Sequence, residues 1–155
     1  EGGRPSQLYK FRTMVQNAET NGAEMASSHD GRVTPVGRWL RMLRLDELPQ
    51  LFNILKGDMS IVGPRPERPE LIEQYCRQYP EFRYRLKVKA GLTGYAQVFG
   101  RYNTLFEDKL KLDLLYIQHF SLIFDFYLII STVKVLFMPS SSAGVEEKDL
   151  GGKRA

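Results

Sequence analysis

Prolines and glycines divide this chain into short segments, so it can fold only into short helices and strands joined by turns. The chain has 8 prolines and 13 glycines among its 155 residues. Proline is tolerated in the first turn of a helix but not in its interior, and glycine favours the position just after a helix ends. Pro35 and Pro69 therefore predict helix starts, Gly57 predicts a helix end, and Pro80 predicts a stop.

The helix that Pro35 opens has an apolar stripe and a basic face. Thr34 can cap its first free N–H groups. The stripe, which we expect to be buried, consists of Val36, Trp39, Leu40 and Leu43. The basic face consists of Arg38, Arg41 and Arg44.

The remaining segments predict a mainly helical α/β or α+β domain with short strands. A second helix carries apolar residues from Leu48 to Leu55, with Asp46 as its cap and Pro49 in its third position. Helical spacing continues after Pro69 and again over residues 104–118, whereas residues 84–90 alternate apolar and basic and predict a strand. Glycines on either side of residues 95–99 predict turns there.

The last apolar stretch, residues 120–138, approaches the roughly 20 residues that a membrane-spanning helix needs. It contains Asp125 and Lys134, and a charged residue at mid-membrane costs about 2.5 to 3.5 kcal/mol. A spanning helix is therefore disfavoured. A core helix is favoured over a helix lying on a membrane surface, and both remain open.

Composition limits the classes of protein. A chain of 155 residues that is 43% apolar suits one folded domain, and its formal charge of +4 indicates anionic partners without identifying them. One cysteine and two histidines exclude a disulfide scaffold and leave little basis for a zinc site. We expect a domain over residues 1–138, with a loop near residues 16–30, and a disordered tail over residues 139–155.

The adjacent carboxylates Asp46 and Glu47 are the sharpest chemical feature of the sequence. At a helix start, free N–H groups and the helix dipole stabilise negative charge, so both side chains should be ionised at neutral pH. Ionised carboxylates can bind Mg²⁺ or act as nucleophiles. Ordinary capping of a structural helix is the alternative interpretation.

Basic residues surround this pair in the sequence. Pro64 and Pro66 hold Arg65 in an extended segment, which reduces the entropy lost when its guanidinium grips a phosphate. Lys10 and Arg12 alternate with Phe11 as in a short strand, and they could supply positive charge or simply form a solvated edge.

Asp113 could be a further acid of the site, although its spacing from Lys109 favours an i,i+4 ion pair. The phosphate-binding loop, the dinucleotide-binding glycine pattern and the hydrolase Gly-x-Ser-x-Gly turn are all absent from the sequence. A carboxylate pair among arginines and lysines then suits metal-assisted phosphoryl chemistry.

Several blocks of the sequence resemble the bacterial sugar transferase family, the monotopic polyprenyl-phosphate hexose-1-phosphate transferases. One is Leu45-Asp46-Glu47-Leu48-Pro49-Gln50-Leu51, and another ends in Gly63-Pro64-Arg65-Pro66. The others span residues 9–14, 32–41, 91–98 and 109–116, so that the match runs in order from about residue 8 to residue 137. Members have a membrane-embedded helix hairpin before the first block, and we expect this chain to be the catalytic domain without it.

The resemblance implies a fold with amphipathic helices at the membrane interface and a specific reaction. A sugar-1-phosphate passes from a UDP-sugar to polyprenyl phosphate, through an intermediate on Asp46, and UMP is released. It implies that Glu47 assists Asp46 and that both hold Mg²⁺. It further implies phosphate or substrate roles for Arg41, Arg65, Lys10, Arg12, Arg101 and Asp113.

The implied setting is the cytoplasmic face of the bacterial inner membrane, where such enzymes begin exopolysaccharide, capsule, O-antigen or glycoprotein glycan synthesis. The sequence leaves association into a homo-oligomer open. The rival hypothesis is a non-catalytic peripheral module that binds anionic lipid or nucleic acid through its arginines. Nucleic acid is not expected, because the aromatic residues do not interleave with the basic ones as a stacking platform requires.

Overall fold

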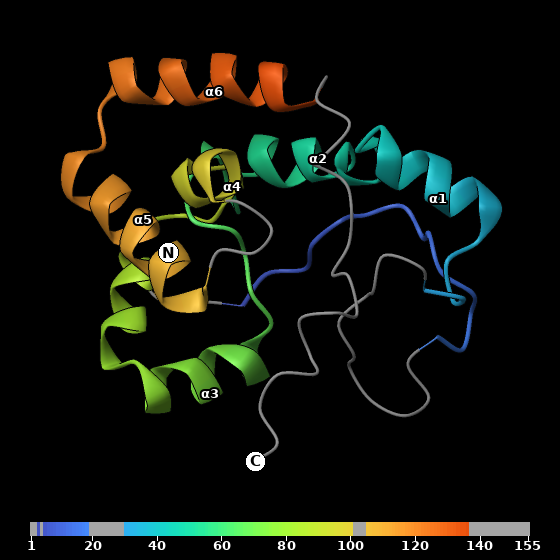
Figure 1. The fold of residues 1–155 in the computed structure, drawn as a ribbon, viewed down its shortest axis with the longest axis horizontal. Helices are drawn as coiled ribbons and strands as arrows, with labels where there is room; N and C mark the ends of the chain where they lie inside the picture. The colour runs from blue at the N-terminus through green and yellow to red at the C-terminus, as the bar shows by residue number, and fades with distance from the viewer. Residues whose placement is uncertain (1–2, 4, 19–29, 101–104, 137–155) are drawn as a thin grey trace.

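The computed structural model describes residues 3, 5–18, 30–100 and 105–136, and these form a mainly helical domain with a small sheet (Figure 1). Loop residues 19–29, Arg101 and the expected tail lie outside the described residues. The helices are α1 (Pro35–Met42), α2 (Gln50–Leu55), α3 (Pro69–Gln78), α4 (Tyr95–Phe99), α5 (Phe106–His119) and α6 (Leu122–Leu136). Two 3-10 segments, η1 (Leu45–Glu47) and η2 (Pro80–Lys87), connect them. The predicted fold class is confirmed.

A parallel pair of short strands lies at the centre of the fold. β1 (Ser60–Val62) pairs with β2 (Gly91–Thr93), and Val62 stands opposite Thr93. Helix α6 packs against both strands, with Leu128 fully buried between Val62 and Tyr116. This core joins segments that are distant in the sequence and all follow the carboxylate pair.

Helix α6 is the apolar stretch whose location the sequence left open. Its Asp125 accepts a hydrogen bond of 2.8 Å from the Tyr116 hydroxyl, so the charge that argued against a spanning helix has a partner inside the protein. Among the described residues, none of the helices is long and apolar enough to cross a membrane.

The predicted start of α1 is confirmed, and it fixes where α1 sits. The Thr34 hydroxyl accepts a hydrogen bond of 2.9 Å from the Gly37 N–H, and Pro35 occupies the first turn. Gly37 then lies directly against the backbone of Thr13, where a Cβ atom would come within 2.0 Å of the Thr13 carbonyl oxygen. Only glycine allows α1 and the N-terminal segment to approach so closely.

The strand predicted over residues 84–90 is wrong. Residues 80–87 form η2, which follows the predicted helix α3. Phe82 and Arg85, three residues apart, lie on one side of this 3-10 segment and are both buried. The alternating pattern placed Arg85 on a solvent face, but the Asp113 carboxylate on α5 gives it a buried partner at 2.8 Å.

Two other local expectations need correction. Residues 95–99 form the short helix α4 rather than turns, because Tyr95 packs against Phe124 of α6. The second helix begins at Gln50, and Asp46 lies before it within η1 instead of capping it. Arg44, in the left-handed conformation with φ 55°, reverses the chain after α1, and Pro49 then precedes α2 rather than standing within it.

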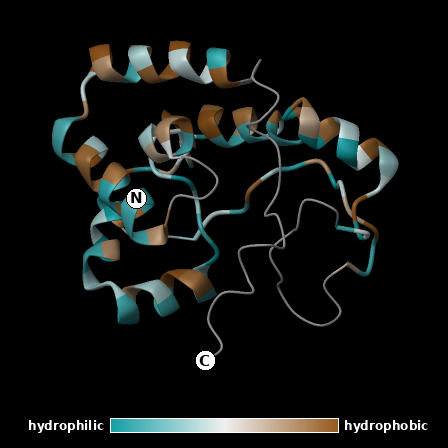
Figure 2. Ribbon diagram, in the orientation of Figure 1, coloured by the Kyte–Doolittle hydropathy of each residue, from teal (hydrophilic) through white to brown (hydrophobic). Residues whose placement is uncertain are grey.

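Helices α1 and α2 turn their apolar residues outward, so the expected burial of the α1 stripe is wrong. Val36 is 69% exposed and Trp39 is 55% exposed, whereas Gly37 faces the protein. On α2 the polar Gln50 and Asn53 are buried. The exposed apolar residues of α2 and the turn before it are Leu48, Leu51, Phe52 and Leu55. Figure 2 shows the apolar colouring along α1, α2 and α6.

The close approach at Gly37 predicts a large effect of one methyl group. Gly37→Ala should lower the free energy of unfolding by about 2 to 3 kcal/mol, because the backbone of Thr13 must move to admit the Cβ. Gly31→Ala is the matched control: nothing lies within 4 Å of the added atom, and the change should stay within about 0.5 kcal/mol. Urea denaturation of both variants measures the difference, and equal effects would contradict the packing described.

The buried Asp113 predicts a pH dependence of stability. Burial raises the pKa of Asp113 from 3.8 to about 6, although the neighbouring Arg85 charge opposes the rise. Between these two pH values the folded protein keeps a proton that the unfolded chain has released, so stability should fall as the pH rises through this window.

Asp113→Asn should remove this part of the pH dependence, as urea midpoints measured from pH 4 to pH 7 would show. Asp108→Asn, which alters an exposed carboxylate of the same helix, should retain it. Parallel curves for the unchanged protein and Asp113→Asn would contradict the assignment.

Candidate active site

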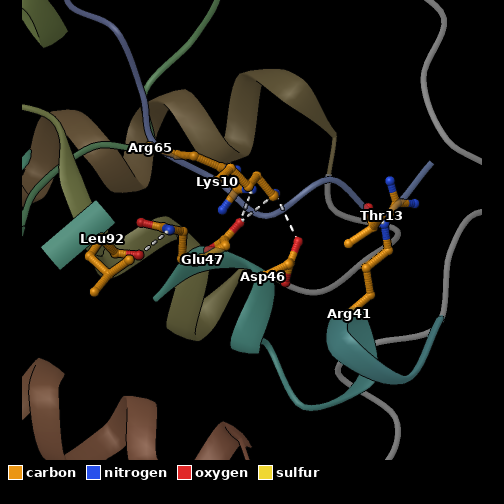
Figure 3. A network of polar contacts seen from close by, with 8 residues as sticks. Lys10, Thr13, Arg41, Asp46, Glu47, Arg65 and Leu92 are labelled. Atoms are coloured by element: carbon orange, nitrogen blue, oxygen red, sulfur yellow. Dashed lines mark hydrogen bonds and ion pairs between the residues drawn. The ribbon is translucent and has the colours of Figure 1, made fainter. Parts of the chain in front are cut away.

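Asp46 and Glu47 face two cations from distant parts of the chain. The Lys10 ammonium lies 3.1 Å from Asp46 Oδ2 and 3.1 Å from Glu47 Oε1, so it bridges the two carboxylates. The Arg65 guanidinium lies 2.9 Å from the same Glu47 oxygen (Figure 3). The Asp46 residue is only 4% exposed, whereas the side chains of Lys10 and Arg65 are 41% and 47% exposed. The cluster therefore opens to the exterior on its cationic side.

Asn53 of α2 holds the segment that carries Lys10. Its side-chain oxygen accepts a hydrogen bond of 3.0 Å from the Tyr9 N–H, and its amide donates one of 2.6 Å to the Gln7 carbonyl. The Phe11 N–H donates to the carbonyl of Asp46 itself at 3.0 Å. Residues 10–12 do not form the predicted strand, because the Phe11 N–H bonds to the turn that carries Asp46 rather than to a neighbouring strand.

Arg65 is held from behind by the buried ion pair. Arg85 donates through Nε to Asp113 at 2.8 Å and through a terminal nitrogen to the Arg65 carbonyl at 2.8 Å. Pro64 and Pro66 restrict the backbone on either side. The Arg65 side chain therefore reaches Glu47 from a backbone whose position is fixed by another arginine.

The charges in this cluster favour an ionised Glu47. Burial opposes its ionisation, but the Arg65 and Lys10 charges together outweigh burial, so the pKa of Glu47 lies below its ordinary value of 4.5. At neutral pH Glu47 is therefore an ionised carboxylate whose charge is balanced by Lys10 and Arg65. The same two cations can bind phosphate oxygens.

The other residues implied by the resemblance lie at different distances from this cluster. Arg41 donates to the Thr13 hydroxyl at 2.8 Å, apart from Lys10 and Arg65 in Figure 3. Arg12 is exposed, and no hydrogen bond or ion pair joins its side chain to another described residue. Asp113 is buried and pairs with Arg85 instead of Lys109. It is linked to the cluster indirectly, because Arg85 also donates to the Arg65 carbonyl.

Sequence reasoning missed Asn53 and Arg85, which position Lys10 and Arg65. Asn53 had a recognisable signal, because it is a polar residue in a helix whose other face is apolar and it proves fully buried. The signal at Arg85 was misleading, because the alternation of apolar and basic residues placed it on the basic face of a predicted strand.

The carboxylates provide only part of a metal site. Within the described ranges no group of three or more His, Cys, Asp or Glu side chains could hold a metal ion. Magnesium, however, is commonly bound through one or two carboxylates, substrate phosphates and water. Asp46 and Glu47 fit that pattern when a diphosphate supplies the other oxygens.

Comparison with known proteins connects this geometry to a family. The family model described as "Bacterial sugar transferase" matches residues 1–139. The chain is 45% identical over 139 residues to an N-acetylgalactosaminephosphotransferase of Aeromonas hydrophila that is named for UDP-N-acetylgalactosamine and undecaprenyl phosphate, covering 88% of this chain and 33% of the relative.

Two further relatives carry similar names. A putative undecaprenyl-phosphate N-acetylgalactosaminyl 1-phosphate transferase of Bacillus subtilis is 54% identical over 86 residues, covering 56% of this chain and 48% of the relative. A UDP-glucose:undecaprenyl-phosphate glucose-1-phosphate transferase of Caulobacter vibrioides is 43% identical over 140 residues, covering 87% of this chain and 52% of the relative.

The chain spans between a third and about half the length of these three relatives. The family match, in contrast, covers nearly all of the chain and includes both the carboxylate pair and the Pro-Arg-Pro segment. The protein belongs to the bacterial sugar transferase family.

Proposed function

We propose that this chain transfers a sugar-1-phosphate from a UDP-sugar to polyprenyl phosphate, with undecaprenyl phosphate as the acceptor, and releases UMP. The observation that carries the proposal is the cluster in which Lys10 bridges Asp46 and Glu47 while Arg65 contacts Glu47. The names of the relatives support the classes of donor and acceptor.

Asp46 is proposed as the nucleophile. One of its carboxylate oxygens attacks the phosphorus next to the sugar, the bond from that phosphorus to the bridging oxygen breaks, and UMP leaves with the electron pair. An oxygen of polyprenyl phosphate then attacks the same phosphorus and displaces Asp46. The product is a polyprenyl diphosphate sugar, and the aspartate is regenerated.

The cations are proposed to hold the phosphates through both steps. Lys10 and Arg65 already lie at the carboxylates, so they are close enough to offset charge on a diphosphate bound beside the pair. Glu47 keeps these cations oriented. Arg12, Arg41 and Arg101 remain proposed phosphate contacts, and Asp113 is proposed to act by holding Arg85 behind Arg65.

Asp46 and Glu47 are also proposed to bind Mg²⁺ together with the diphosphate of the donor. The bound ion would supply Lewis-acid stabilisation of the negative charge on the phosphate oxygens. Because Lys10 bridges the same carboxylates, its ammonium must shift toward the substrate when a divalent ion binds.

The outward apolar faces of α1 and α2 support a membrane-surface location. A helix with buried polar and exposed apolar residues is unfavourable in water, but it suits a helix lying in the interface of a bilayer. We propose that these faces rest on the cytoplasmic side of the bacterial inner membrane, where the enzyme begins the synthesis of a surface glycan.

Replacement of the nucleophile gives the most specific prediction. Asp46→Asn should reduce UMP release by at least about a thousandfold, because the amide cannot form the covalent intermediate. Binding of the UDP-sugar should persist. UMP release from UDP-glucose, UDP-galactose and UDP-N-acetylgalactosamine, measured with undecaprenyl phosphate and Mg²⁺, provides the test.

Asp108→Asn is the control for that measurement, because it removes an exposed carboxylate that pairs with Lys111 on α5. It should retain full activity. If Asp46→Asn stayed active, or if the unchanged protein released no UMP from any donor, a non-catalytic module would be the better explanation.

Charge on the outward face should weaken membrane binding. Phe52→Glu combined with Leu55→Glu should reduce co-sedimentation with anionic phospholipid vesicles, since the two residues are 63% and 83% exposed and little internal packing is lost. Leu105→Glu, at another position that is 69% exposed, should bind vesicles as the unchanged protein does. Equal binding by all three proteins would refute the proposed orientation.

A further inference from the structure

Two cavities lie near the residues of the cluster. The first, of about 320 Å³, has Arg65, Glu67 and Arg85 in its wall, is otherwise largely apolar, and is lined by neither carboxylate of the pair. The second, of about 250 Å³, includes Glu47 in its wall and is otherwise mainly apolar. Its apolar lining consists of Leu48, Ile61, Leu92, Val98, Ile129 and Val133. Figure 3 shows Leu92 on the side of Glu47 away from Arg41.

The polar side chains that line the second cavity beyond its charged end are engaged with the protein itself. Thr132 donates to the Leu128 carbonyl at 2.7 Å and lies 2.6 Å from the Thr93 hydroxyl, which therefore donates to it. The Gln97 amide nitrogen donates to the Leu92 carbonyl at 3.0 Å, whereas the buried Gln97 Oε1 has no hydrogen-bond partner among the described residues. A ligand in this cavity thus meets mainly apolar surface, with charge from Glu47 and Arg44 at one end.

This arrangement matches one end of a prenyl phosphate. In the proposed reaction, the acceptor must bring its phosphate to Asp46, and its hydrocarbon chain begins directly at that phosphate. A mainly apolar cavity that has Glu47, the neighbour of Asp46, in its wall provides a place for the first part of the chain. Its volume of about 250 Å³ suits a short length of chain.

The cavity is also continuous with the outward apolar surface. Leu48, Ile61 and Val133 line it and are 48%, 49% and 49% exposed, so its wall reaches the exterior. Leu48 lies two residues before the start of α2, whose Leu51 and Phe52 face outward. A chain leaving the cavity on this side would enter the bilayer without crossing a polar surface.

We propose that this second cavity, between α6, α4 and the start of α2, binds the isoprene units nearest the phosphate of the polyprenyl phosphate acceptor. The inference rests on the proposed function and adds a separate subsite for the acceptor. The prenyl chain then reaches the carboxylate pair through the cavity that Glu47 lines, while the nucleotide sugar binds outside this cavity, at Lys10 and Arg65.

Filling the cavity provides the kinetic test. Val133→Trp should raise the KM for undecaprenyl phosphate at least about tenfold, because an indole occupies space meant for the chain. The exchange of labelled UMP into UDP-sugar, which needs only the donor and Asp46, should be unchanged. Leu115→Trp, at a 45% exposed position on α5, is the matched control and should leave both measurements unchanged.

These measurements separate the two proposals. Absence of both UMP exchange and turnover in the unchanged protein would refute the proposed function. With an active protein, an unchanged KM for the acceptor in Val133→Trp, or an equal loss of exchange and turnover, would refute the acceptor subsite.

Photolabelling tests the same subsite without any substitution. An undecaprenyl phosphate bearing a diazirine in its first isoprene units should label β2, α4 or the second half of α6, which peptide mass spectrometry can identify. Labelling confined to the outward faces of α1 and α2 would show that the chain bypasses the cavity and would refute the inference.

Discussion

The Lys10 ammonium between two adjacent carboxylates is the interaction on which the rest of the structure depends. It joins the N-terminal segment to the turn that precedes α2, and it compensates Asp46, which is nearly buried, and Glu47. A carboxylate pair without such a cation would repel itself in a region of low solvent access. Lys10 and Arg65 can each release a carboxylate and bind a phosphate in its place.

Each cation is held by a side chain that never contacts the carboxylates. Asn53 holds the segment of Lys10, and Arg85, itself neutralised by Asp113, holds the backbone of Arg65. These supports come from α2 and from the packed pair of η2 and α5. The geometry of the cluster therefore depends on the whole fold. Asp46 and Glu47 are adjacent in the sequence, but Lys10 and Arg65 are distant from them.

Local signals predicted the parts of the fold that depend on neighbouring residues. Thr34 and Pro35 marked the start of α1, and Pro69 and Pro80 bounded α3, because caps and prolines act within one turn. Arg85 and residues 95–99 were misjudged because their partners, Asp113 and Phe124, are distant in sequence. The α1 stripe was misjudged because periodicity identifies an apolar face but does not identify what covers it.

The outward apolar faces of α1 and α2 and the apolar cavity beside Glu47 are the surfaces proposed to meet lipid. The central claim is that Asp46 bonds transiently to phosphorus. Its most direct test is peptide mass spectrometry after incubation with a UDP-sugar and Mg²⁺ in the absence of acceptor. The account predicts a sugar-phosphate adduct on Asp46 that disappears when polyprenyl phosphate is added. UMP release with an adduct on a different residue, or with no adduct at all, would contradict it.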